Sequence, residues 1–203
     1  MQAVGVHDRT TMSHTAAGSA RSPASSRRLI VALLTGAVVF GAVALFAANH
    51  KPDYTFSMFG IGGANSLSTK SKIATGVFGL ALLQLLGALW IYGRLPGVRT
   101  APRPVGKLHR VSGLVLFLAT VPVAVHCIWA YGFQTSPTRV FVHSLAGCLF
   151  YGAFAAKVVV VRSRRLPGWA LPLAGGVLFT VVVVIWYSAA LWFLNGHQLP
   201  FGT

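Results

Sequence analysis

The stretch VPVAVHCIWAYGFQTSPTRVFVHSLAGC, residues 121–148, decides the fold class because two apolar segments flank the short polar turn GFQTSPT. These segments extend over residues 111–131 and 140–161, each about as long as the roughly 20 helical residues that cross a membrane. Three further apolar runs cover residues 29–48, 73–92 and 169–194. A backbone in lipid must satisfy its own hydrogen bonds, and the runs lack the alternation of barrel strands. The sequence therefore predicts an all-α, five-span transmembrane helical bundle.

The charge pattern predicts how this bundle is oriented. Of the 203 residues, 55% are hydrophobic and only 9% are charged, a composition typical of membrane proteins. Most of the 17 basic residues lie before the first span, between the second and third, and at the end of the fourth. The positive-inside rule then gives a multi-pass plasma-membrane protein with a cytoplasmic N-terminus and an extracytoplasmic C-terminus. The net charge of +15 indicates contact with anionic lipid, and no soluble basic module with interleaved aromatic residues points to nucleic acid.

The remaining segments divide simply. Residues 1–28 are rich in Ala, Ser, Thr and Arg without an apolar period, which predicts a disordered basic cytoplasmic tail. Residues 29–194 form the transmembrane domain, and residues 195–203 form an external tail. The first apolar run is longer than a usual signal-peptide core, so we expect an uncleaved anchor.

Acidic residues are too few for most enzyme chemistry. The chain has only two, and one of them lies in the predicted tail, which excludes catalysis by paired carboxylates. Phosphate-binding loops, GxSxG elbows and HExxH motifs are also absent from the sequence. We therefore assign no catalytic residue.

Two histidines within the spans are the main candidates for a site, because ionisable groups inside membranes are costly and often functional. His126 and His143 lie nearly the same number of residues from the turn. Both are therefore expected at the same depth, about two helical turns from the ends of the two spans that the turn joins. Two neutral imidazoles at one depth fit the axial ligands of haem b. Pro122 should kink the third span, and Gly147 leaves room beside His143. Packed helices lie about 8–10 Å apart, so the two spans would have to splay; otherwise one histidine would pair with a ligand from another helix, such as His50.

Other polar residues have weaker claims. Arg139 and the external lysines could offer charge to haem propionates. His109 begins the third span and either contacts headgroups, caps the helix or binds a second haem. His50, with Asp53 and Tyr54, could contact a metal or quinone, or stabilise the external loop. The histidine pair itself could serve only as interhelical hydrogen-bond donors.

Several stretches together resemble an uncharacterised family of multi-pass membrane proteins from actinobacteria. They are HKPDYTFSMFG, APRPVGKLHR, VHCIWAYGFQT, HSLAGCLFYGAFAAKVVVVRSR, LPGWALP and WYSAALWF, and they cover residues 50–194. This resemblance implies a membrane location and no established activity.

A more distant resemblance, to cytochrome b561 and ferric-reductase-like transmembrane domains, rests on LHRVSG opening a span that ends near His126, followed by the span with His143. It implies that His126 and His143 hold an outer haem and that His109 belongs to an inner one. The inner end of span four, AAKVVVVRSRR, offers no histidine to pair with His109, so at most one pair is complete.

Two main hypotheses follow. The first is a haem-b electron carrier that exchanges electrons with quinol or an external redox protein, with His126 and His143 as axial ligands. The second is a non-catalytic membrane subunit or scaffold of a larger complex, suggested by the lack of a complete catalytic constellation and by small-residue spacings such as Gly152 to Ala156. A quinone or metal site at His50 and Asp53 is a third possibility.

Overall fold

The bundle predicted from the apolar runs is present in the computed structural model, which describes residues 23–98, 101–163 and 166–200. The helices are α1 (Pro23–Asn49), α2 (Gly63–Ile91), α3 (Arg103–Tyr131), α4 (Thr138–Arg162), α5 (Ala170–Ile185), the π-helical segment η1 (Trp186–Leu191) and α6 (Trp192–Leu194). Five segments are long and apolar enough to cross a membrane, because α5, η1 and α6 form one continuous span. The all-α, five-span prediction is therefore confirmed.

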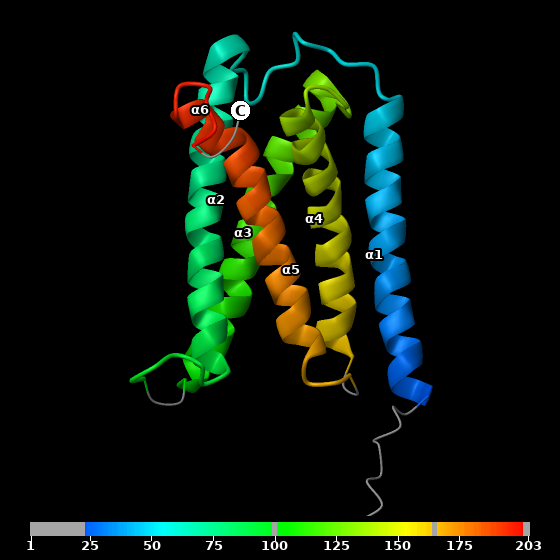
Figure 1. The fold of residues 1–203 in the computed structure, drawn as a ribbon, viewed down its shortest axis with the longest axis vertical. Helices are drawn as coiled ribbons and strands as arrows, with labels where there is room; N and C mark the ends of the chain where they lie inside the picture. The colour runs from blue at the N-terminus through cyan, green and yellow to red at the C-terminus, as the bar shows by residue number, and fades with distance from the viewer. Residues whose placement is uncertain (1–22, 99–100, 164–165, 201–203) are drawn as a thin grey trace, which may run out of the picture.

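The helices pack as two groups joined through α5 (Figure 1). One group is the pair α2 and α3, and the other is α4 packed between α1 and α5. The end of α5 and η1 contact α2 and so join the groups. Although α3 and α4 are consecutive, they are not one of the closely packed helix pairs. These two helices are therefore splayed apart, as the sequence analysis required for a haem bound between them.

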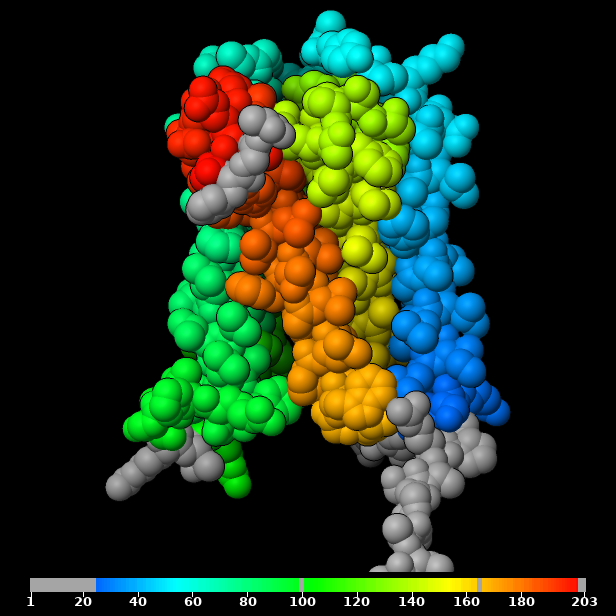
Figure 2. Space-filling model, viewed as in Figure 1, coloured from blue at the N-terminus to red at the C-terminus, as the bar shows by residue number. Residues whose placement is uncertain are grey.

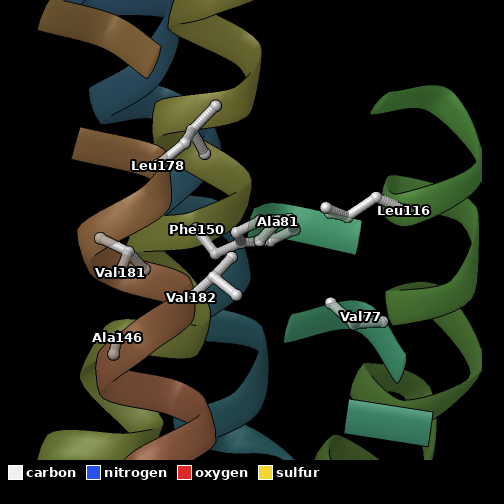
Figure 3. Packing of buried hydrophobic residues seen from close by; sticks show 8 residues of the cluster. All are labelled: Val77, Ala81, Leu116, Ala146, Phe150, Leu178, Val181 and Val182. Atoms are coloured by element: carbon white, nitrogen blue, oxygen red, sulfur yellow. The ribbon is translucent and has the colours of Figure 1, made fainter. Parts of the chain in front are cut away.

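The core lies where the two groups meet. Its buried apolar residues are Val77, Ala81, Leu116, Ala146, Phe150, Leu178, Val181 and Val182. Figure 3 shows Phe150 and Val182 pointing across the bundle toward Ala81 and Val77. Aromatic side chains complete the bridge between α3 and α4, since the ring of Phe117 stacks on that of Phe154 with centroids 4.0 Å apart. Side chains, rather than direct helix packing, therefore close the middle of the gap.

Small residues bring α1 close to α4. A Cβ added at Gly152 would lie 2.6 Å from the carbonyl oxygen of Gly36 and 2.8 Å from Cβ of Phe40, so only glycine fits this crossing. The rest of α1 is largely exposed, with Leu33 and Val38 each at 69%. Figure 2 shows α1, in blue, as a ridge along one edge of the molecule. Its outward apolar face matches contact with the bilayer.

Helix boundaries differ from the predicted spans chiefly in α2, which begins at Gly63 rather than at residue 73. The earlier start is polar, but its side chains bond back along the helix: Ser66 Oγ donates to the Gly63 carbonyl at 2.7 Å, and Thr69 Oγ1 donates to the Asn65 carbonyl at 2.9 Å. Lys70 therefore lies within the helix. Residues 23–28 of the predicted tail are the start of α1, while residues 1–22 and 201–203 lie outside the described ranges.

Candidate functional site

A cavity of about 410 Å³ lies between α3 and α4, reaching from the turn that joins them toward the middle of the bundle. We call this end of the bundle the turn end. Arg139, His143 and Gly147, all predicted from the sequence, line the cavity together with Lys70. Its volume falls within the range of roughly 300–1,000 Å³ that is usual for small-molecule sites.

The cavity is floored by aromatic residues and left open by small ones. The hydroxyl of Tyr151 donates to Thr120 Oγ1 at 3.2 Å, which ties α4 to α3 beside the Phe117 ring. Nearer the turn, a Cβ added at Gly147 would meet nothing within 4 Å. The floor thus holds the helices apart, while the residues nearer the turn leave the space between them empty of side chains.

His143 is held in a defined tautomer by Ser188. The Nδ1 atom of His143 lies 3.1 Å from Ser188 Oγ, and the Ser188 hydroxyl donates its own proton to the Val184 carbonyl at 2.6 Å. Because a hydroxyl has only one proton, Oγ accepts a hydrogen bond from Nδ1–H. We therefore assign the lone pair of the neutral ring to Nε2, the atom that a metal ligand needs.

Arg139 reaches the same segment of η1. Its Nη1 donates to the Ser188 carbonyl at 2.5 Å, and its guanidinium carbon lies 3.7 Å from the ring centre of Trp192. π-Helical turns are rare and occur frequently at functional sites. Here η1 gives one residue, Ser188, whose side chain fixes His143 and whose carbonyl fixes Arg139.

His126 is at the predicted end of the bundle but does not line the cavity. It is only 2% exposed, and its Nδ1 lies 3.3 Å from Nζ of Lys70. Its Nε2 is buried and has no hydrogen-bond partner within the described part of the chain. Lys70, 6% exposed, also lies 4.4 Å over the ring of Tyr131. His126 is therefore connected to the cavity through Lys70.

His109 is remote from this site. It lies toward the other end of α3, about 25 Å from His126 at the helical rise of roughly 1.5 Å per residue. Gln84 Nε2 donates to its carbonyl at 2.8 Å, and its buried Nδ1 has no partner in the described residues and would lie 3.2 Å from a Cβ added at Gly87. The structure does not bring His109 to the cavity.

His50 and Asp53 also lie outside the cavity, in and beside the α1–α2 loop. The His50 ring packs between Phe46 and Trp129, with centroid distances of 5.8 and 5.2 Å. Hydrogen bonds from the side chain and the backbone of Thr55 lower the pKa of the exposed Asp53 carboxyl. Within the described ranges, no three His, Cys, Asp or Glu residues gather into a group that could hold a metal ion.

Sequence reasoning did not single out Ser188 or the role of Lys70. Ser188 lies in the apolar run of residues 169–194, where a lone hydroxyl gives little signal. Lys70 precedes the predicted second span by only a few residues. This closeness to an apolar run was the one feature of the sequence that could have indicated its place in the bundle.

Comparison with known proteins places the chain in a family. A family model described as a family of unknown function, DUF6529, matches residues 29–201, which include the last four spans and all but the first few residues of the first. No curated protein and no solved structure matches the chain. The expected membership of an uncharacterised family is confirmed, whereas the actinobacterial source and the likeness to cytochrome b561 stay predictions. The chain belongs to the DUF6529 family of unknown function.

Proposed function

We propose that this integral membrane protein is an electron carrier that holds haem b in the cavity between α3 and α4. It would exchange electrons with quinol or with an external redox protein. The observation that supports this most directly is the tautomer of His143, whose Nδ1 is fixed by Ser188 so that Nε2 carries the lone pair. A neutral imidazole presented in this way is the usual protein ligand of haem iron.

The other groups around the cavity fit the same cofactor. Lys70 and Arg139 line it as cations suited to propionates, and Gly147 leaves space for a flat ring. The splayed hairpin removes the difficulty that closely packed helices would leave too little room. Haem b would supply one-electron chemistry, while the protein would supply the ligands, the charge and the exclusion of water.

In this proposal His126 would be the second residue to hold the haem iron, through its buried Nε2. Its ring does not line the cavity and would have to turn toward it when haem binds. Binding iron through Nε2 requires a proton on Nδ1, and that proton would point to the amine of Lys70, 3.3 Å away. An ammonium has no lone pair to accept it. Ligation by His126 therefore goes with an uncharged Lys70 and leaves Arg139 as the cation for the propionates. Ligation by His143 alone goes with a charged Lys70, so that both cations face the propionates.

The test is the difference spectrum, dithionite-reduced minus air-oxidised, of protein purified from haem-replete cells. We expect a b-type α band that His143→Ala abolishes, and that His126→Ala shifts or abolishes. His109→Ala is the matched control, since His109 lies far from the cavity, and it should leave the band unchanged. A folded wild-type protein without this band would remove the proposal.

One of the two observations that suggested the scaffold hypothesis is accounted for within the chain. The small-residue spacing of Gly152 and Ala156 is used within the chain, because both residues contact Gly36 of α1. It therefore gives no sign of a partner protein. A plasma-membrane location with the turn end outside remains part of our proposal, and it rests on the distribution of basic residues.

A further inference from the structure

The cavity contains positive charge that nothing in the described structure balances. Lys70 and Arg139 enter it from α2 and α4. Asp53 is the one acidic residue within the described ranges, and its carboxylate lies in the exposed loop, where Thr55 binds it. Buried cations in a bundle of this kind normally pair with an anion or with backbone carbonyls.

Within the described residues, much of the hydrogen-bonding capacity of both cations is unused. The ammonium of Lys70 has three donors, and its polar contact is with His126 Nδ1 at 3.3 Å, besides the face of the Tyr131 ring. The guanidinium of Arg139 has five donors, and Nη1 donates to the Ser188 carbonyl. The remaining donors can serve an anionic oxygen in the cavity.

Away from these two side chains the cavity wall is mostly apolar. Val77, Phe150 and Val182 line its deeper part, toward the middle of the bundle. Both cations lie nearer the turn end, since Arg139 is in the first turn of α4 and Lys70 contacts Tyr131, the last residue of α3. A ligand that matches this wall has an ionised head at the turn end and an apolar body between α3 and α4.

We propose that the cavity is a binding site for an amphipathic acid, whose ionised head is held by Lys70 and Arg139. Haem, with its two propionates, belongs to this class, and so does a fatty acid. The inference shares its cavity with the proposed function but does not need iron or either histidine. The inference specifies that the ligand has a negatively charged head, and it does not depend on whether the apolar body is a porphyrin or a hydrocarbon chain.

The test compares the affinities of haem-free protein in detergent for an acid and for the uncharged ester of the same acid. Parinaric acid and its methyl ester have the same fluorescent body, and Trp186 and Trp192 line the cavity as energy donors. We expect the acid to bind about tenfold or more tightly than the ester, since a charge-assisted hydrogen bond typically gives at least that factor. Equal affinities in the wild-type protein would overturn the proposal.

Variants locate the selectivity. Lys70→Met combined with Arg139→Leu should bind acid and ester alike, whereas Lys70→Arg should keep the preference because it keeps the cation. Lys72→Met is the matched control, since Lys72 is exposed on the same helix and should not matter. A preference that survives the double variant, shown by its melting curve to be folded, would overturn the assignment of these two residues.

Haem and its dimethyl ester, added to the same haem-free preparation, separate this inference from the proposed function. No haem binding together with a preference for parinaric acid would remove the proposed function alone. Binding of haem together with equal binding of parinaric acid and its methyl ester, and of haem and its dimethyl ester, would remove the inference alone.

Discussion

The Nδ1 atom of His126 lies 3.3 Å from the Nζ atom of Lys70, in a contact where both side chains are buried. One proton occupies this contact, and its position decides what His126 can do. If Lys70 is an ammonium, it donates, and His126 keeps its own proton on Nε2. If the amine is neutral, Nδ1–H donates, and Nε2 is free to bind iron.

We predict that in haem-free protein His126 accepts from a charged Lys70, because an ammonium always has a proton to donate across this 3.3 Å contact. Nitrogen-15 spectra of histidine-labelled protein, assigned with His126→Ala, should then show an unprotonated Nδ1. Lys70→Met removes the donor and should give a mixture of tautomers, while Lys72→Met should change nothing. A protonated Nδ1 in the wild-type protein would show that the amine is uncharged.

Ser188→Ala tests the orientation of His143. It removes the hydroxyl that accepts from His143 Nδ1 but keeps the backbone carbonyl that Arg139 binds. Loss of such a supporting partner typically weakens ligand binding by about 10–100-fold, so haem affinity should fall by that factor. Ser163→Ala removes a hydroxyl that bonds the Val159 carbonyl at the opposite end of α4, and its haem titration should match the wild type. Unchanged affinity in Ser188→Ala would leave the serine only a structural role.

Gly152→Ala tests the crossing of α1 and α4. Its new Cβ would overlap the Gly36 carbonyl and Phe40, so the helices must move apart. We expect the free energy of unfolding to fall by about 1–3 kcal/mol, the usual cost of overpacking. Gly41→Ala places its Cβ in open space on α1 and should cost nothing. Equal stability of the two variants, measured by reversible unfolding in mixed micelles, would contradict this crossing.

Asp53 gives a prediction for the loop between α1 and α2. Because bonds from Thr55 depress the pKa of this carboxyl in the folded chain, they favour the folded loop above the unfolded pKa of about 4. That contribution is lost as the pH falls through the lower, folded pKa. A carbon-13 titration of Asp53 should show a pKa that rises in Thr55→Ala, which lacks the hydroxyl. A pKa that does not change would mean that the hydroxyl bond is absent in solution.

The spans could be predicted because hydropathy reports directly on burial in lipid. The start of α2 could not, since its serines and threonines look polar in sequence while their hydroxyls bond back to helix carbonyls. Such residues extend a helix without raising its hydropathy. Lys70 was therefore expected in a loop and lies in a helix.

The candidate site could be predicted only in part, because counting residues from a turn gives depth and not direction. The face of α3 toward the cavity holds Thr120, Ala124, Cys127 and Tyr131, spaced three or four residues apart. His126 is one residue from Cys127, about 100° around the helix, and points elsewhere. Ser188 comes from a span distant in sequence, and a π-helical turn leaves no mark in an apolar run.

The dependence of α1 on α4 has a consequence for how the protein is made. Chains emerge from the ribosome N-terminus first, so α1 is synthesised before its main packing partner exists. Until Gly152 follows, this helix must persist in the bilayer as a solitary segment. Its most apolar stretch has a higher hydropathy than that of any of the other four spans, which favours its stability in lipid without a packing partner.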